Sequence, residues 1–209
     1  MLFELHCHST FSDGINTPKE IVDYAIKIGL NGISITDHDT IKGSIESLKY
    51  DTKDFTVIPG IEISSKEGHI LGINIKTLIP KNLSAKDTID TIHSTGGIAI
   101  AAHPYDRFRK GVGNLIFELP FDAVEISNGH TLGSTRDTRK ICIITRLPMV
   151  GGSDAHTLQE IGQVKIEYKD DIIEAIKTGK ITIISKPPPT LLLNHGIGMI
   201  KRKLLNKLK

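Results

Sequence analysis

The chain has 209 residues, a length that suits one large domain or two small ones. Its 39% hydrophobic and 24% charged residues are typical of a soluble globular protein. A formal net charge of +2 excludes the strongly basic balance of a chain that binds nucleic acid or membranes through charge alone. The aromatic content is only 5%, without Trp, which argues against stacking platforms for bases.

The two cysteines, Cys7 and Cys142, match neither a disulfide framework nor a zinc-finger spacing. This cysteine usage favours a reducing compartment. Residues 1–4 lead directly into a strand without the pattern of a signal peptide, and no apolar run is long enough to span a membrane. We therefore expect a cytoplasmic protein with no membrane partner.

Strands and helices alternate along the chain. Thr17-Pro18 with Glu20, and later Ser84 with Asp87, fit the N-cap patterns that begin helices. Seven strands are expected, at 2–8, 32–36, a third extended stretch formed by 55–58 and 60–64, 68–75, 98–102, 122–127 and 149–152, with 164–168 either a further strand or a tail. The expected helices are 17–29, 40–48, 84–96, 134–146 and 170–177. The alternation predicts βα units, a parallel sheet and an α/β fold.

Side chains that bind metals follow these strands. His6 and His8 share one face of the first strand and Cys7 the other, because side chains alternate along a strand. An isolated His-x-His is also compatible with a surface strand, but further candidates follow at later strand ends, which meet on one face of a barrel. The candidate metal ligands are His6, His8, Asp13, His38, Glu62, His69, His103, Asp154 and His156.

The chemistry of this set indicates more than one ion. Imidazole and carboxylate ligands without thiolate suit Zn, Mn or Fe. One catalytic ion needs three or four protein ligands, so nine are too many for one ion and enough for two or three, especially if one carboxylate bridges. We therefore expect two to three divalent metal ions as cofactors.

The motifs together resemble the PHP (polymerase and histidinol phosphatase) family. They are, in order, His6-x-His8 with Asp13, Thr36-Asp37-His38-Asp39, Gly60-Ile61-Glu62, Gly68-His69, His103-Pro104 and Gly152-Ser153-Asp154-Ala155-His156. The resemblance implies a distorted seven-stranded (β/α) TIM-like barrel, a trinuclear metal site and phosphoesterase activity. It covers residues 6 to 156 and leaves the tail beyond about residue 180 uncovered.

The resemblance also implies which residues hold each ion. The implied sets are His6, His8, Glu62 and Asp154 for the first ion, a bridging Glu62 with His69 and His103 for the second, and Asp13, His38 and His156 for the third. Asp13 stands where some members have histidine, which favours the small phosphoesterase branch over histidinol phosphatase.

The expected reaction is hydrolysis of a phosphate ester. The charge of three divalent ions exceeds that of three carboxylates, so the pocket attracts a phosphate dianion and lowers the pKa of a bridging water. We expect a metal-bridging hydroxide to attack phosphorus, with Glu62 bridging the ions and Asp154, His156 or water protonating the leaving group. The expected substrate is a small phosphorylated metabolite or nucleotide, for example a 3′,5′-bisphosphonucleotide.

Other polar residues near strand ends have two interpretations. Arg107 and Arg109 fit either bidentate binding of a substrate phosphate or a solvated loop, and Asn128 fits either a substrate contact or a turn. Asp37 and Asp39 flank His38 and fit either orientation of ligand imidazoles or a turn and helix cap. The three remaining histidines lack a motif and are expected to be structural: His93, His130 and His195.

Three other functions remain open. A 5′-3′ exonuclease on short RNA or DNA would use the same chemistry in a pocket open along a strand, with an oligonucleotide as its partner. Histidinol phosphatase is a second enzyme alternative. A non-catalytic PHP-like scaffold is an alternative of another class, and it predicts lost ligands. Nothing in the sequence predicts an oligomeric state.

The domain expected from the resemblance is a barrel over residues 1–184. Residues 185–209 contain the stiff spacer Pro187-Pro188-Pro189 and a basic amphipathic helix. We expect that helix to pack on the barrel, and the alternative is binding of RNA or an acidic partner.

Overall fold

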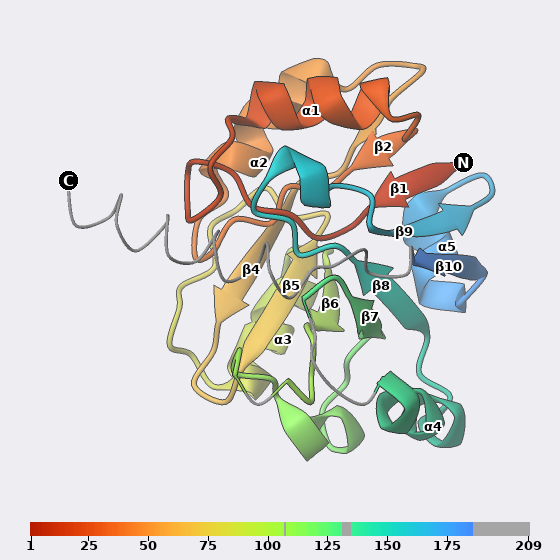
Figure 1. Ribbon diagram of the computed structural model, residues 1–209. Helices are drawn as coiled ribbons and strands as arrows, with labels where there is room; N and C mark the ends of the chain where they lie inside the picture. The colour runs from red at the N-terminus through yellow and green to blue at the C-terminus, as the bar shows by residue number, and fades with distance from the viewer. Residues whose placement is uncertain (107, 131–134, 186–209) are drawn as a thin grey trace.

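The computed structural model describes residues 1–106, 108–130 and 135–185, without the side chains of 135–138 and 141 (Figure 1). These residues form ten strands and five α-helices in a mixed α/β fold, so the α/β prediction is confirmed. Their order is β1 (Leu2–Glu4), α1 (Pro18–Lys27), β2 (Gly32–Ile33), α2 (Lys42–Ser47), β3 (Thr56–Val57), β4 (Gly60–Ser64), β5 (His69–Ile73), α3 (Ala85–Ser94), β6 (Ile98–Ala101), β7 (Ala123–Asn128), α4 (Thr135–Thr145), β8 (Met149–Gly152), β9 (Val164–Tyr168), α5 (Ile172–Thr178) and β10 (Ile181–Ser185).

The strands form two mixed five-stranded sheets, in the orders β10-β9-β1-β2-β3 and β4-β5-β6-β7-β8. The expectation of a parallel sheet is wrong for several pairs, because β5 is antiparallel to both β4 and β6, and β9 is antiparallel to β1. Only four residues separate β4 from β5, too few for the crossover that a parallel pair requires. The start of β5 therefore lies at the same edge as the ends of its two antiparallel neighbours, β4 and β6.

Two isolated parallel bridges join the sheets beside the motif residues. Cys7 pairs with Ala155, and His38 pairs with Glu62. The His8 N–H donates to the Ala155 carbonyl at 2.8 Å, next to the first bridge. In the part of the chain that the structure describes, the strand ladders form two sheets rather than one closed barrel, so the seven-stranded barrel stays a prediction.

Both faces of the β4–β8 sheet are buried. Alternate residues of β5 enter different hydrophobic clusters, Ile70 with α3 on one face and Leu71 with β1 and α5 on the other. A third cluster lies between α1 and β2, along the upper part of Figure 1. Sheets covered on both faces carry the near-continuous apolar runs seen here at 98–102 and 69–73.

Local signals located most of the elements. The Thr17 capping box and the Ser84 N-cap are both present. The stretch 164–168 is a strand, β9, and β10 pairs with it although the sequence analysis left β10 unassigned. The strands expected at 2–8 and 32–36 are shorter, and their last residues continue as extended chain that carries the motifs. The spacer and basic helix expected at 185–209 lie outside the described residues apart from Ser185.

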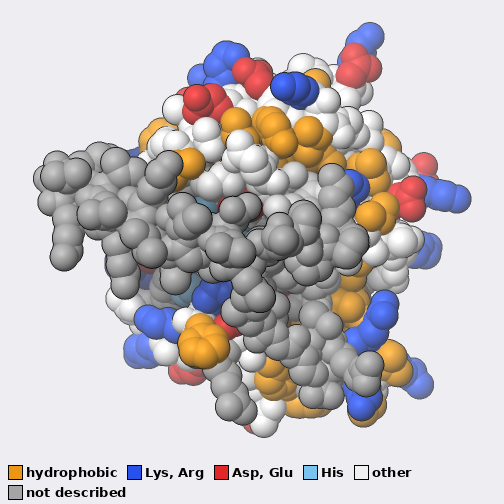
Figure 2. All heavy atoms as spheres, viewed as in Figure 1, with side chains coloured by type: hydrophobic (Ala, Val, Ile, Leu, Met, Phe, Trp, Pro, Cys, Tyr) orange, Lys and Arg blue, Asp and Glu red, His pale blue; other side chains and the backbone are white. Residues whose placement is uncertain are grey.

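Among the described residues, none of the helices has the length and apolar character required to cross a membrane. Figure 2 shows Lys and Arg interspersed with Asp and Glu over the described part of one face. No single sign of charge dominates that part of the surface.

Replacing Thr17 by Ala is expected to lower the free energy of unfolding by about 1 kcal/mol. The change removes the N-cap hydroxyl of α1, which accepts a hydrogen bond from the Glu20 N–H at 3.3 Å. Urea denaturation followed by circular dichroism measures the loss. Lys19→Ala removes only an exposed ion pair with Asp23 and should leave the midpoint unchanged; equal losses in the two variants would contradict a specific role for the cap.

Candidate metal centre

The segment after β1 supplies the first two candidate ligands. His6 and His8 are 0% and 1% exposed and point to one side, whereas Cys7 joins the opposite hydrophobic cluster, as strand alternation predicts. The Nε2 atoms of His6 and His8 lie 3.3 Å apart. Asp154 Oδ1 lies 3.0 Å from His8 Nε2 and 3.5 Å from His6 Nε2.

The Glu62 carboxylate, on β4, lies at the centre of the cluster. Its Oε2 is 3.1 Å from His6 Nε2, 3.2 Å from His8 Nε2 and 3.3 Å from His38 Nδ1. Glu62 is fully buried, so these rings replace water around its charge.

The other oxygen of Glu62 faces a different pair of rings. Oε1 lies 2.9 Å from His69 Nδ1 and 3.1 Å from His103 Nε2. His69 begins β5 and His103 follows β6, and their rings meet because these strands are antiparallel. The two Glu62 oxygens thus face separate ligand groups, which is the arrangement that a bridging carboxylate requires.

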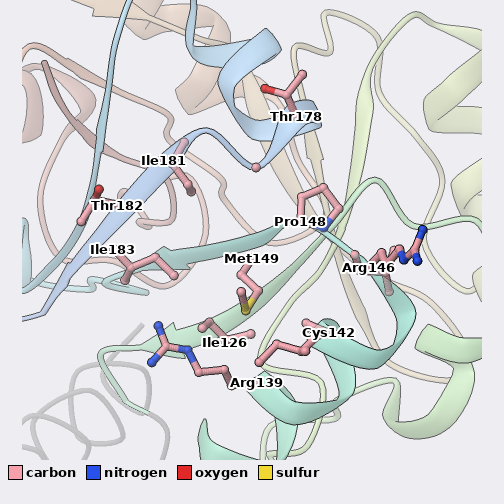
Figure 3. Close-up of a pocket in the computed structure, with 13 residues that line it drawn as sticks. Ile126, Arg139, Cys142, Arg146, Pro148, Met149, Thr178, Ile181, Thr182 and Ile183 are labelled. Atoms are coloured by element: carbon pink, nitrogen blue, oxygen red, sulfur yellow. The ribbon is translucent and has the colours of Figure 1, made fainter.

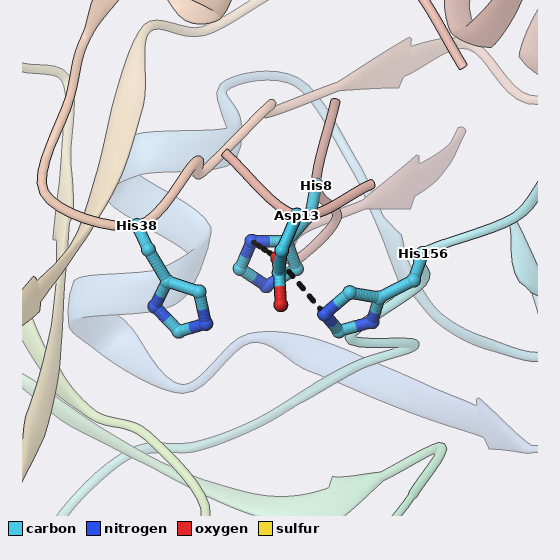
Figure 4. Close-up of side chains that lie close together, drawn as sticks. All are labelled: His8, Asp13, His38 and His156. Atoms are coloured by element: carbon cyan, nitrogen blue, oxygen red, sulfur yellow. Dashed lines mark ion pairs between the residues drawn. The ribbon is translucent and has the colours of Figure 1, made fainter. Parts of the chain in front are cut away.

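A third group lies on the outer side of His8 (Figure 4). Asp13 Oδ1 is 3.2 Å from His156 Nε2 and 3.7 Å from His8 Nδ1. The His8 ring stacks with those of His38 and His156, at centroid separations of 4.6 and 4.4 Å. All nine candidate ligands are therefore in one continuous cluster.

The loop that carries Asp13 is held by a buried carboxylate. Asp37 accepts hydrogen bonds from the N–H and hydroxyl of Ser9 and from the hydroxyl of Ser12, each at 2.7 Å. Asp39 instead accepts from the N–H and hydroxyl of Ser64 on β4. These contacts of the two aspartates fix backbone segments beside the site.

Two candidate ligands have left-handed backbone conformations. The φ angle is 52° at Asp154 and 30° at His103. Non-glycine residues rarely adopt positive φ, and such conformations cluster at functional sites. Each residue lies two positions after the end of a strand, where the left-handed turn directs the side chain toward the cluster.

Proton affinities in the cluster reflect burial and mutual charge. Burial alone would lower the pKa of His8, but its contacts with Asp154 and Glu62 raise it to about 10. Burial would raise the pKa of Glu62, but the His6 and His38 rings outweigh it and hold that pKa well below its usual range. Burial likewise opposes ionisation of Asp154, and His6 with His8 lowers its pKa strongly. The carboxylates thus require nearby positive charge.

The donor geometry fits divalent cations. The groups His6, His8, Glu62 and Asp154; His38, Glu62 and His69; and His8, Asp13, His38 and His156 each place their donor atoms within 4.8 Å of one another. In the first group, the separations of 3.0 to 3.5 Å match the ~3.4 Å between ligands on a tetrahedral ion with bonds of about 2.1 Å. His103 lies beside the second group through Glu62 Oε1.

Comparison with known proteins agrees with these motifs. The sequence model described as PHP domain matches residues 4–144, and one described as PHP-associated matches residues 136–181. The chain belongs to the PHP domain family. The first match contains seven candidate ligands, from His6 to His103, and the second contains Asp154 and His156.

Relatives with similar sequences match this PHP domain over different fractions of its length. An uncharacterized protein of Methanocaldococcus jannaschii is 37% identical over 162 residues, which are 71% of this chain and 94% of the relative. A 5′-3′ exoribonuclease of Haemophilus influenzae is 42% identical over 85 residues, 38% of this chain and 31% of that enzyme. The latter similarity thus spans under a third of the exoribonuclease.

A solved structure shares the fold of this PHP domain. It is a two-domain protein from Bacteroides vulgatus described as containing a predicted PHP-like metal-dependent phosphoesterase. The TM-score is 0.76 at 21% identity, over 88% of this chain and 64% of that one.

The predicted substrate-binding residues lie beside Asp154 where the structure describes them. Arg109 donates to Asp154 Oδ2 and, at 2.9 Å, to Asn128 Oδ1. Asn128 donates to Glu125 Oε2 at 2.9 Å and to Asp154 Oδ2 at 3.3 Å. Arg107 lies outside the described residues.

Sequence reasoning missed a carboxylate of the PHP domain. Glu125 on β7 is 2% exposed, and its Oε1 accepts from His6 Nδ1 at 3.0 Å. Its Oε2 accepts from the His103 N–H and from Asn128, both at 2.9 Å. The sequence feature that could have identified Glu125 is its position as the single charged residue in the otherwise apolar strand 123–126. Burial of a charge is destabilising unless the charge has hydrogen-bond or ionic partners.

The three histidines without a motif divide into separate cases. His93 pairs with Asp122 at 2.8 Å on the surface, as a structural residue does. His130 lies against His156, at 5.7 Å between ring centroids, and burial lowers its pKa to about 4. His130, His156 and Glu160 form a further group of potential ligands, a proximity that the sequence did not indicate. His195 lies outside the described residues.

A pocket of about 440 Å³ lies elsewhere, between α4, β8 and β10 (Figure 3). Met149 at the start of β8 lines it together with Cys142 and Ile183, and none of the nine candidate ligands does. Asp154 follows the opposite end of β8. The pocket is therefore separate from the metal centre.

Glu125→Gln is expected to reduce the metal content without unfolding the PHP domain. An ionised carboxylate can accept hydrogen bonds but cannot donate them, so His6 Nδ1 must carry the proton that faces Glu125. The lone pair of His6 Nε2 is then available to a cation. Glutamine has one acceptor oxygen. It must either direct its NH₂ at His6, which moves the proton to Nε2, or direct it at the His103 and Asn128 donors.

Elemental analysis after dialysis measures this loss, with circular dichroism to verify folding. Asp122→Asn is the matched control, because Asp122 likewise accepts from a histidine ring and a backbone N–H, those of His93 and Ala99, neither of which is a candidate ligand. Equal metal contents in Glu125→Gln and the unaltered chain would contradict the role of Glu125.

Proposed function

We propose that this chain is a metal-dependent phosphoesterase acting on a small phosphorylated metabolite or nucleotide. The observation that carries the proposal is the Glu62 carboxylate, whose two oxygens face separate groups of imidazoles. The PHP-like phosphoesterase fold of the Bacteroides vulgatus protein and the 31% identity over 87 residues to a phosphoribosyl 1,2-cyclic phosphate 1,2-diphosphodiesterase of Eggerthella lenta support it.

Two to three divalent ions, of Mn, Zn or Fe, fit the proposed ligand sets. The first is His6, His8, Glu62 and Asp154; the second is Glu62, His69 and His103; the third is Asp13, His38 and His156. When bound, such ions supply Lewis-acid stabilisation of the charge on a phosphoryl group.

The side chains of the chain itself bind and orient the ester in this proposal. The Arg109 side chain is a quarter exposed, and its guanidinium donates to Asp106 and Asn128. Its Nη1 group can exchange the contact with Asp154 for a contact with a substrate phosphate, while Nε and Nη2 keep their contacts with Asp106 and Asn128. Asp154, His156 or water is the proposed proton donor to the leaving oxygen, and His156 Nδ1 lies 2.8 Å from the Asp154 carbonyl.

The proposal also includes the seven-stranded barrel expected from the sequence. β1, β2 and β4–β8 would form the seven-stranded barrel, and the Cys7–Ala155 and His38–Glu62 bridges support closure between β8 and β1 and between β2 and β4. A cytoplasmic location and a domain boundary near residue 184 remain predictions from the sequence.

A 5′-3′ exoribonuclease is the second candidate. The 42% identity to the Haemophilus influenzae enzyme over 85 residues favours it. Histidinol phosphatase and a non-catalytic scaffold have less support, because Asp13 is in the cluster and all nine candidate ligands are present.

A substrate screen of the metal-loaded protein separates these functions. The panel contains phosphomonoesters, bisphosphonucleotides and short oligonucleotides. Preference for the small esters is expected. Preference for oligonucleotides with strong dependence on salt would favour the nuclease, and hydrolysis of none of them would contradict the phosphoesterase.

The purified protein is expected to contain two to three equivalents of Mn, Zn or Fe. The fully buried Glu62 has two separate ligand groups, so a single ion cannot satisfy all its neighbours. Elemental analysis under non-chelating conditions measures the content. Less than one equivalent would contradict the multinuclear proposal, and removal of metal by a chelator should abolish hydrolysis reversibly.

His38→Ala is expected to lower kcat at least about 100-fold, a range typical for loss of a metal-site group. Its Nδ1 lies 3.3 Å from Glu62, so the change removes one ring from the cluster. Steady-state hydrolysis of an activated phosphate ester measures it. His93→Ala removes a histidine with a surface carboxylate partner and should retain full activity. Unchanged activity of His38→Ala would contradict the site.

A further inference from the structure

A buried carboxylate outside the nine candidate ligands lies beside the metal centre. Asp106, in the loop between β6 and β7, is 6% exposed. A charge buried to this extent is strongly destabilising unless other groups solvate it, so its partners indicate what it does. Its two oxygens accept from the Phe108 N–H and from the guanidinium of Arg109, the arginine that the proposed function assigns to the substrate phosphate.

The backbone at Asp106 is fixed relative to two candidate ligands. Its N–H donates to the His103 carbonyl at 2.9 Å, and its own carbonyl accepts the Gly111 N–H at 3.3 Å. The Lys110 carbonyl accepts the His69 N–H at 2.9 Å, which attaches the far side of the same loop to β5. The Asp106 side chain therefore starts from a backbone position that is fixed with respect to the cluster.

Asp106 and Asp154 contact different parts of the Arg109 guanidinium. Asp106 Oδ2 accepts from Nε at 3.1 Å and from Nη2 at 2.9 Å, whereas Nη1 donates to Asp154 Oδ2. A guanidinium is planar and rigid, so a contact that holds its Nε–Nη2 edge also sets the direction of Nη1. The Asp106 carboxylate thus directs Nη1 at Asp154.

This direction brings Nη1 next to the first ligand group. Asp154 Oδ1 lies 3.0 Å from His8 Nε2 and 3.5 Å from His6 Nε2, and Asp154 Oδ2 accepts from Arg109. The Arg109 side chain is a quarter exposed and, without a partner on its inner edge, would lose rotamer freedom on binding a phosphate. With Asp106 in place, that loss of freedom has already occurred in the folded chain.

We propose that Asp106 is a positioning residue that orients Arg109 toward the phosphate of the substrate. Its effect on phosphate binding passes through Nη1 of Arg109, and Asp106 itself touches no substrate. The proposal rests on the proposed phosphoesterase function and adds a residue that belongs neither to the ligand sets nor to the substrate contacts. A carboxylate that only stabilised its own loop would instead act on phosphate binding independently of Arg109.

A double-mutant cycle on phosphate binding tests this coupling. Asp106→Asn keeps the size of the side chain but replaces one acceptor by an NH₂ group, which must face either Arg109 or the Phe108 N–H. At equal zinc content, calorimetry is expected to show that inorganic phosphate binds about 10-fold more weakly to Asp106→Asn than to the unaltered chain. In the Arg109→Ala background, the same substitution should change the affinity by less than about 2-fold. Equal losses in the two backgrounds would overturn the proposal.

Asp37→Asn is the matched control for the cycle. Asp37 is also a buried carboxylate beside the site, but its partners are Ser9 and Ser12 rather than Arg109. Its effect on phosphate binding should be the same with and without the Arg109 side chain, because the effects of residues that share no partner add. Circular dichroism verifies that each variant is folded. Coupling to Arg109 as strong for Asp37 as for Asp106 would overturn the proposal.

Arg109→Lys tests the same role with Asp106 unaltered. The ammonium keeps the charge but has no second edge for Asp106 to hold, so phosphate is expected to bind about 10-fold more weakly. An affinity equal to that of the unaltered chain, or no phosphate binding by the unaltered zinc-loaded chain, would overturn the proposal. If none of the screened esters is hydrolysed, the phosphoesterase proposal fails, whereas the phosphate-binding cycle still decides whether Asp106 positions Arg109.

Discussion

The buried Glu62 carboxylate is the constraint on which the rest of the structure depends. A charge removed from water is strongly destabilising unless other groups solvate it, and five imidazoles contact its two oxygens. Those imidazoles come from four separate segments of the chain. The strands β1, β2, β4, β5 and β6 and the extended residues that follow them must therefore be in register at one edge before this charge is accommodated.

Further buried carboxylates hold the backbones that carry the cluster. Burial raises the pKa of Glu4, whose oxygens accept from Ser153 N at 2.9 Å and Gly162 N at 2.7 Å. Glu125 joins the His6 ring to the His103 backbone, and Asp37 holds the loop before Asp13. The site thus has an outer layer of acceptors in which each carboxylate connects two segments that are distant in sequence.

The sequence predicted the cluster better than it predicted the sheets. Metal-binding residue types recur at strand ends, and their spacing resembles one family, so the nine positions could be named before the fold was known. The antiparallel pairing of β5 was not predicted, because strand patterns in the sequence do not encode direction and the short connection after Ser64 was not weighed. Glu125 and His130 were not selected, because their importance depends on neighbours, His6 and His156, that only the fold brings close.

The Cys7–Ala155 bridge has a consequence for how the protein folds. It pairs the first strand segment with one almost 150 residues later, and the His8–Asp154 contact spans a separation of 146 residues. Closing so long a loop carries an entropic penalty and slows folding. During synthesis, His6 and His8 leave the ribosome long before their partners and cannot form the first ligand set until residue 154 has been made. The ligand cluster therefore forms late in folding, only after the N-terminal and C-terminal parts of the described chain have packed together.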